Sequence, residues 1–213
     1  MRRAPSRRPA AVLLGLALAC SSLPPPQIGS PGPELQDGDA NAYYQNVLQH
    51  FSAQRQVFIG FDTILFGGVT YESPVFVDAR IRRRDAFQAK PVDLLNKDLQ
   101  AAQEELSGDF YEFTLGVYMQ NPKFDDIGQQ GSIWRLALVT PTGEFPPLLV
   151  KRLGHANMNT RAYYPYMGDF WNVFQVRFPK SVDGRPVAPP EVGTFTVLLA
   201  SSIGRAEFPL PTR

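Results

Sequence analysis

From residue 110 onward, apolar and polar side chains alternate with a period of two, in runs of six to ten residues. Glycine, proline, asparagine or aspartate bounds these runs, as is typical of β-strands joined by turns. The predicted strands cover residues 110–119, 132–140, 147–153, 171–178, 194–202 and 205–210. In addition, the P-T-G sequence at 141–143 separates two extended runs and is a hairpin signal. Several short strands with turn signals predict an antiparallel two-sheet sandwich, of the immunoglobulin-like or jelly-roll type.

The first half of the chain carries helical patterns. A helix is predicted over 40–54, and the residues at i, i+3, i+4 and i+7 on its apolar face are Tyr44, Val47, Leu48 and Phe51. Another helix is predicted over 91–106, between Pro91 at its start and Gly108 after its end. Residues 74–87 begin with a Ser-Pro start signal, and their alternation also fits a strand. Helix is the preferred interpretation of this segment.

A buried strand is predicted over 57–66, where β-branched and aromatic residues are frequent and the pair Gly67-Gly68 follows. Together these patterns predict a mainly β domain, α+β by content, with two or three helices in its N-terminal half. Because 44% of all residues are hydrophobic, the chain can bury one sizeable core. We therefore expect a single domain over 39–213.

The start of the chain has the pattern of an export signal. Residues 1–9 contain four arginines and no acidic residue, and residues 10–19 are uncharged and rich in Ala, Val and Leu. A charged segment followed by a short apolar one is typical of a signal peptide. The uncharged run is about half of the roughly 20 residues that a membrane-spanning helix requires. Residues 1–19 are therefore predicted to be a signal peptide.

The sequence L-A-L-A-C at 16–20 ends at Cys20, the only cysteine of the chain. It resembles the lipobox of bacterial lipoproteins, although the commonest form has Leu in the place of Ala17. The resemblance implies cleavage by signal peptidase II between Ala19 and Cys20, and acylation of Cys20. In that family Ser21 is typical of sorting to the outer membrane, where the organism has two membranes. The alternative is a secreted protein that is cut after Ala19 and keeps a free thiol.

Residues 20–38 contain five prolines, three glycines and few apolar side chains, so they are predicted to form a tether. Residues 1–19 hold four of the 21 basic side chains and none of the 20 acidic ones. The remaining chain therefore has 17 basic against 20 acidic side chains, a net charge of −3. This balance provides no basic footprint, and nucleic acid is not an expected partner.

No catalytic or metal-binding motif is found in the sequence. The two histidines, His50 and His155, have no nucleophile elbow near them, and no acidic partner can be named. With one cysteine and no clustered histidines, neither a transition-metal site nor a cofactor is expected. The basic run of Arg80, Arg82, Arg83 and Arg84 is interpreted as a solvated helix face. A stripe for lipid head groups or an acidic partner is the alternative.

The sequence A-Y-Y-P-Y-M-G-D-F-W at 162–171 is the most suggestive segment for binding. Its five rings, which form the candidate binding surface, are Tyr163, Tyr164, Tyr166, Phe170 and Trp171. Tyrosine and tryptophan clustered at a loop are frequent in sugar- and protein-binding surfaces, because these rings bury a large area and keep a polar tip. The competing interpretation is that the rings cover the open end of the sandwich.

The expected function is that of a lipid-anchored cell-envelope protein, held to the membrane through a lipid on Cys20. We expect a non-enzymatic assembly or interaction module whose partner is another envelope protein. The alternative is a lipoprotein that binds a carbohydrate or a peptide through the 162–171 loop. An envelope hydrolase ranks third, because no acid, base and nucleophile that converge can be assembled from the sequence.

Overall fold

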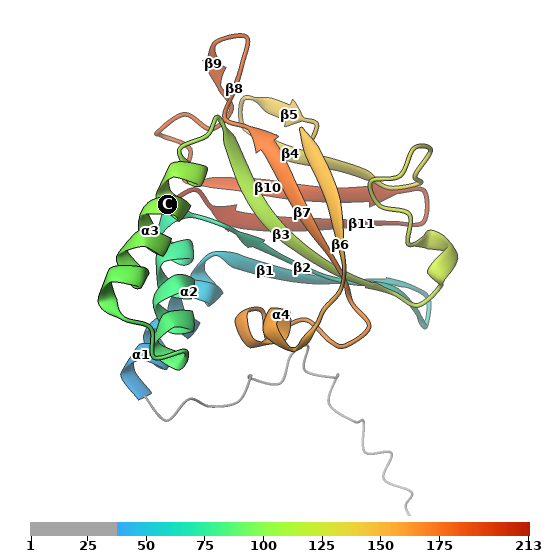
Figure 1. Cartoon of the computed structure of the whole chain (residues 1–213). Helices are drawn as coiled ribbons and strands as arrows, with labels where there is room; N and C mark the ends of the chain where they lie inside the picture. Colours follow the sequence, from blue (N-terminus) through green and yellow to red (C-terminus); the bar gives the residue numbers. More distant parts are fainter. Residues whose placement is uncertain (1–37) are drawn as a thin grey trace, which may run out of the picture.

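The computed structural model describes residues 38–213 (Figure 1). The predicted signal peptide, its cleavage site at Ala19 and Cys20, and the tether up to residue 37 lie outside the described residues. The helices are α1 (Gly38–His50), α2 (Pro74–Phe87), α3 (Val92–Leu106) and α4 (Met158–Tyr163), and a 3-10 turn, η1, spans Pro122–Phe124. The strands are β1 (Ser52–Ile59), β2 (Asp62–Tyr71), β3 (Phe110–Met119), β4 (Arg135–Thr140), β5 (Gly143–Phe145), β6 (Leu149–His155), β7 (Asn172–Pro179), β8 (Ser181–Val182), β9 (Arg185–Pro186), β10 (Thr194–Ser201) and β11 (Gly204–Pro211).

The strands form two antiparallel sheets that pack together. One sheet has the order β1-β2-β3-β7-β6, the other has the order β11-β10-β4-β5, and β8 and β9 form a separate ribbon. In Figure 1 the four-stranded sheet crosses behind the five-stranded one, and β11 runs beside β1. The prediction of a mainly β, antiparallel two-sheet sandwich with three helices in its N-terminal half is confirmed.

The core lies where the two sheets face each other. Phe195 of β10 packs against Tyr71 of β2 and Phe113 of β3, with ring centroids 5.1 and 5.3 Å apart. Phe113 also meets Phe178 of β7 at 5.6 Å, again with the edge of one ring against the face of the other. Such edge-to-face pairs add about 0.5–1.5 kcal/mol each beyond the area that they bury. Aromatic side chains from both sheets therefore hold the layers together.

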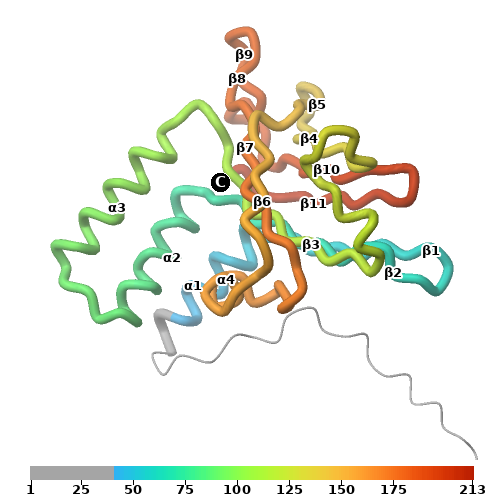
Figure 2. Tube along the Cα trace, turned by 45° about the vertical axis from the view of Figure 1, so that its right-hand side comes forward, coloured from blue at the N-terminus to red at the C-terminus, as the bar shows by residue number. Residues whose placement is uncertain are grey.

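The helices cover one side of the sandwich, as Figure 2 shows. The preferred helix over 74–87 is confirmed as α2, and the side chain of Ser73 caps it by accepting a hydrogen bond from the Phe76 amide at 3.1 Å. The other two predicted helices are confirmed as α1 and α3, although α1 ends at His50 rather than at residue 54. The apolar side of α3 is only half-buried, so this helix lies at the periphery.

The strand predicted over 57–66 is wrong in its boundaries. The chain turns at Gly60 and Phe61 within that segment, so that β1 and β2 form a hairpin. Gly60 has a φ of +62°, which glycine adopts without steric cost. The pair Gly67-Gly68, which was expected to end the strand, lies inside β2.

Gly67 and Gly68 have a packing role instead. A Cβ on Gly67 would lie 2.8 Å from the ring of Phe208 on β11. A Cβ on Gly68 would lie 2.4 Å from the ring of Tyr166, which is buried. The two glycines therefore let large rings approach the backbone of β2.

The P-T-G signal is a hairpin turn, between β4 and β5. The strand predicted over 147–153 is observed as β6, but it pairs with β7 in the other sheet. The break falls at Pro146 and Pro147, which have no backbone N–H to donate to a ladder. The chain therefore leaves one sheet and enters the other at this proline pair.

We expect Gly68→Ala to lower the free energy of unfolding by about 1–3 kcal/mol, because the added methyl group overlaps the buried ring of Tyr166. Urea-induced unfolding measures this change. Gly193→Ala is the matched control, since a Cβ there meets no atom within 4 Å. Equal stability of the Gly68→Ala variant and the wild type would contradict the packing role.

Candidate functional site

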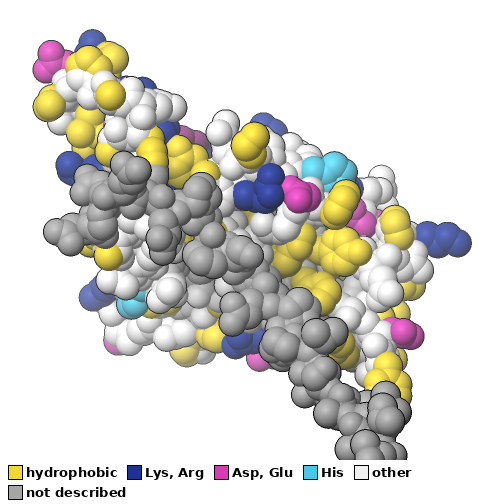
Figure 3. Space-filling model, turned by 90° about the horizontal axis from the view of Figure 1, so that it is seen from below, with side chains coloured by type: hydrophobic (Ala, Val, Ile, Leu, Met, Phe, Trp, Pro, Cys, Tyr) yellow, Lys and Arg dark blue, Asp and Glu magenta, His cyan; other side chains and the backbone are white. Residues whose placement is uncertain are grey.

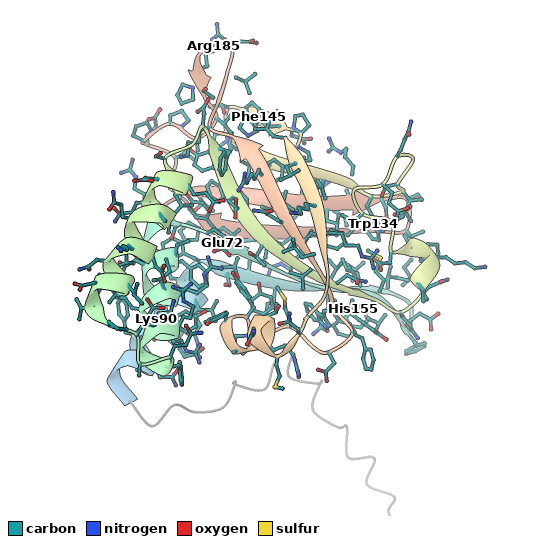
Figure 4. The ribbon with its side chains drawn as sticks, viewed as in Figure 1. Glu72, Lys90, Trp134, Phe145, His155 and Arg185 are labelled. Atoms are coloured by element: carbon teal, nitrogen blue, oxygen red, sulfur yellow. The ribbon has the colours of Figure 1, made fainter. Side chains whose placement is uncertain are left out.

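A buried carboxylate, Glu72, lies at the junction between β2 and α2 (Figure 4). Only 3% of its surface is exposed. Its Oε1 accepts hydrogen bonds from the hydroxyls of Thr114 on β3 and Tyr164 at the end of α4, both at 2.6 Å. Three segments that are distant in the sequence therefore meet at one carboxylate oxygen.

Arg80 of α2 supplies the countercharge. Its Nη2 lies 3.2 Å from Oε2 of Glu72, and its Nη1 donates a hydrogen bond of 2.9 Å to the hydroxyl of Tyr164. Within residues 38–213, Oε2 accepts no hydrogen bond, so the ion pair with Arg80 is its main compensation. Glu72, Arg80, Thr114 and Tyr164 are called the Glu72 network below.

The surroundings shift the pKa values of this network in ways that follow from burial and charge. Burial raises the pKa of Tyr164 well above its usual value, and the negative charge of Glu72 raises it further. Burial by itself lowers the pKa of Arg80, but the Glu72 carboxylate together with Tyr164 and Tyr44 outweighs that effect and raises the pKa overall. The phenol therefore stays protonated and the guanidinium stays charged.

A cavity of about 380 Å³ lies over the Glu72 network, between α2, α3 and β3. Its lining residues are Glu72, Val77, Arg80, Ile81, Arg84, Asp98, Ala101, Ala102, Glu105, Leu106 and Glu112. Most of the charged groups at its rim are paired with a neighbour: Asp98 with Arg84 and Lys90, and Glu105 and Glu112 with Arg177. These ion pairs attach α3 to the rest of the domain.

The arginines of α2 have four different roles. Arg83 is buried, lies 4.3 Å above the ring of Tyr44 and donates to the carbonyl oxygen of Ala162. Arg80 belongs to the Glu72 network, and Arg84 pairs with Asp85 and Asp98. Only Arg82, paired with Asp78, lies on an exposed face. The interpretation of the whole run as a solvated face was therefore wrong, because Arg80, Arg83 and Arg84 contact buried partners.

The five rings of the 162–171 segment do not form one exposed surface. Tyr164, Tyr166 and Trp171 are buried, Tyr163 is half-buried, and Phe170 is 76% exposed. Tyr164 joins the Glu72 network, and the hydroxyl of Tyr166 lies 2.8 Å from that of Thr70 on β2. The candidate binding surface is corrected accordingly: three of the five rings are buried, two of them with a polar partner for their hydroxyl.

The histidines lie apart from the Glu72 network. His50 is exposed at the end of α1, where its Nε2 is 3.0 Å from the carbonyl oxygen of Arg213. His155 is exposed at the end of β6, far from Glu72 in Figure 4. In the described part of the chain, neither imidazole forms an ion pair or a hydrogen bond with a carboxylate. The triad that the hydrolase alternative requires is therefore not assembled around them.

The tip of the β1–β2 hairpin exposes three large apolar side chains in four residues. Phe58 and Ile59 are 53% and 52% exposed, and Phe61 is fully exposed. They flank the turn at Gly60 and lie far from the helices in Figure 1. Sequence reasoning missed this feature, because it placed these residues in the middle of a buried strand.

The chain matches no protein-family model, and comparisons with the curated proteins and with the solved structures return no significant match. Among residues 38–213, none of the helices has the length and apolar character needed to cross a membrane. The same residues contain no group of three His, Cys, Asp or Glu side chains arranged to hold a metal ion.

We expect Glu72→Ala to lower the free energy of unfolding by about 3–5 kcal/mol, because it leaves the half-buried charge of Arg80 and the buried hydroxyl of Tyr164 without their partner. Chemical denaturation measures the loss. Arg82→Ala, which breaks an exposed pair on the same helix, should change stability by less than about 1 kcal/mol. Similar effects of the two substitutions would show that the Glu72 network is not a structural centre.

We also expect stability to fall as the pH rises above about 10. Burial raises the pKa of five tyrosines: Tyr44, Tyr71, Tyr111, Tyr164 and Tyr166. For Tyr71 the pKa rises to about 12. Because unfolded tyrosine ionises near pH 10, the unfolded chain releases protons that the native state retains, and alkali favours unfolding. Below that pH these tyrosines contribute no pH dependence.

The ultraviolet absorbance of phenolate, recorded as a function of pH, checks this expectation. In the folded protein a first group of the eight tyrosines should ionise before the buried ones. In denaturant all eight should ionise together near pH 10. A single transition near pH 10 in a protein that remains folded would contradict the burial argument.

Proposed function

We propose that the protein is a lipid-anchored envelope protein that acts as a non-enzymatic interaction module. The observation that carries the interaction role is the β1–β2 hairpin tip, defined by Phe58, Ile59 and Phe61. Burying such side chains contributes about 1.5–3 kcal/mol each relative to exposure, so leaving three of them in water at one turn is costly. Exposed apolar groups gathered in this way commonly mark an interaction surface.

The geometry of the Glu72 network and its cavity supports a structural role for the buried charges. Glu72 and Arg80 are held by each other and by Tyr164, and the acidic groups at the rim of the cavity are paired with cations. A catalytic acid or base needs a proton-transfer position open to a substrate. The pairing of these groups favours a scaffold over a reaction centre.

The anchor belongs to the proposal on the strength of the sequence. Cys20 follows an apolar segment with a lipobox-like pattern, and a Pro- and Gly-rich stretch separates it from Gly38, where α1 begins. Two or three acyl chains on one cysteine give stable membrane attachment, whereas a single chain gives only marginal binding. Ser21 favours the outer membrane where the cell has two membranes.

The alternative of a carbohydrate- or peptide-binding lipoprotein has less support. It requires the rings of 162–171 to share one accessible surface, and only Phe170 among them is largely exposed. Stacking on a sugar or a peptide needs open ring faces, which Tyr164, Tyr166 and Trp171 do not offer.

We expect Cys20→Ser to move the protein from the membrane fraction to the soluble envelope fraction of the cell, because the thiol that would carry the lipid is lost. Fractionation followed by immunoblotting measures the distribution, and intact-protein mass spectrometry of the wild type detects the added acyl mass. Ser21→Ala is the control, since it keeps the cysteine. Unchanged membrane association of the Cys20→Ser variant would refute the anchor.

A further inference from the structure

We propose that the tip of the β1–β2 hairpin inserts into the boundary between head groups and acyl chains of the bilayer that carries the anchor. This inference rests on the proposed lipid anchor and adds a second, direct contact between the folded domain and the lipid. The hairpin tip is the residue set Phe58, Ile59 and Phe61 defined above.

The tip has the shape and chemistry that interfacial insertion requires. The turn at Gly60 places Phe61, which is fully exposed, at the extremity of two paired strands. The pairing of the two strands runs up to Ile59 and Asp62, so the backbone groups on the facing edges of the hairpin are hydrogen-bonded nearly to the turn. On insertion the apolar side chains would move from water into lipid. This transfer has a favourable free energy, which the isolated domain does not obtain.

Other apolar side chains lie on the same side of the molecule. Met158, the first residue of α4, is 78% exposed, and Phe170, in the connection from α4 to β7, is 76% exposed. In Figure 1 α4 and the β1–β2 hairpin lie in the lower part of the domain. Figure 3 views the molecule from below and shows several groups of hydrophobic side chains on that surface. The lower side therefore offers more than one apolar contact.

The anchor joins the domain through α1, which begins at Gly38 and also lies in the lower part of Figure 1, but at the opposite end of the domain from the hairpin tip. Seventeen residues separate Gly38 from Cys20, and a chain of that length spans at most about 60 Å. A lipid at Cys20 would therefore keep the domain near the bilayer. The effective concentration of lipid around the hairpin tip is then high, so that even a contact of low affinity forms.

A bilayer fits these contacts better than a protein partner. The hairpin tip and Met158 belong to different elements, and the cavity beside the tip is lined by Asp62, Thr63 and Ile64 of β2 rather than by Phe58, Phe61 or Met158. A protein partner would need a matching surface with a continuous, well-packed centre. A fluid bilayer accepts separate convex projections, because its interface has no fixed shape.

The test uses the full-length lipidated protein in vesicles of phosphatidylethanolamine and phosphatidylglycerol, with or without bromine on the acyl chains, which quenches tryptophan fluorescence. The variant is Phe61→Trp, and the matched control is Val182→Trp in the β8–β9 ribbon at the opposite end of Figure 1. Val182 is exposed as well, and the natural Trp134 and Trp171 are buried and contribute equally in both variants.

We expect brominated lipid to quench the added fluorescence of Phe61→Trp by about twofold or more and to leave that of Val182→Trp unchanged. Equal emission of Phe61→Trp in the two kinds of vesicle would overturn the inference, and this is also the result expected if the tip binds a protein. Equal quenching of both variants would overturn it too, since the contact would not be specific to the tip.

The failure of this inference and the failure of the anchor are distinguishable. Acylation of Cys20 is established beforehand by the mass of the purified protein, so the fluorescence measurement asks only where the tip lies. Because Phe61 is fully exposed, Phe61→Trp should fold as the wild type does, and thermal unfolding of the variant checks this. If Cys20 is acylated and brominated lipid does not quench the fluorescence of Phe61→Trp, the proposed anchor stands and the direct contact between the tip and the lipid is refuted.

Discussion

The carboxylate of Glu72 is the point at which three distant parts of the chain are held together. Its partners come from α2, from β3 and from the end of α4, and they include the half-buried guanidinium of Arg80. Removing a charged group from water is expensive unless its partners are in place, so the Glu72 network is stable only when all these segments have arrived. It therefore links the helical layer to the five-stranded sheet more specifically than apolar contact alone would do.

The remainder of the architecture fits around this constraint. Edge-to-face rings such as Phe113 and Phe195 join the two sheets, and the glycines of β2 leave room for Phe208 and Tyr166. Tyr166 lies two residues after Tyr164, so the segment that completes the Glu72 network also packs on β2. Helix α3 depends on ion pairs around the cavity rather than on a buried apolar face. The domain thus combines a rigid aromatic centre with a more polar helical flank.

The functional proposals concern the surface opposite to this polar flank. Nothing in the packing of the core requires Phe58, Ile59 or Phe61 to be exposed at the turn of a hairpin. A protein that is tethered near a bilayer can use such a tip, because the apolar groups that are costly in water become favourable contacts in lipid. The anchor at Cys20 and the hairpin tip would then set both the distance and the orientation of the domain.

The fold was predictable from the sequence where it depends on local periodicity. Alternation of period two predicted the strands from β3 onward. The Ser-Pro start signal predicted α2, and the structure shows that the side chain of Ser73 caps this helix. The hairpin at Gly60 was missed, because Gly60 and Gly67-Gly68 look alike as local signals. The difference between them depends on rings from β11 and from the segment after α4.

The candidate site was less predictable, for the same reason. Arg83 was interpreted as part of a solvated face, and Tyr164 was left between a binding surface and a cover for the sandwich, because long polar side chains with an apolar body fit either environment. Their burial depends on Glu72 and Tyr44, which lie far away in the sequence. The sequence by itself determined the kind of elements, the sandwich class and a single cysteine suited to an anchor, since these depend on local pattern and composition. Only the tertiary structure decided which polar groups are paired inside and which apolar groups remain outside, because burial is a property of neighbours that the chain brings together by folding.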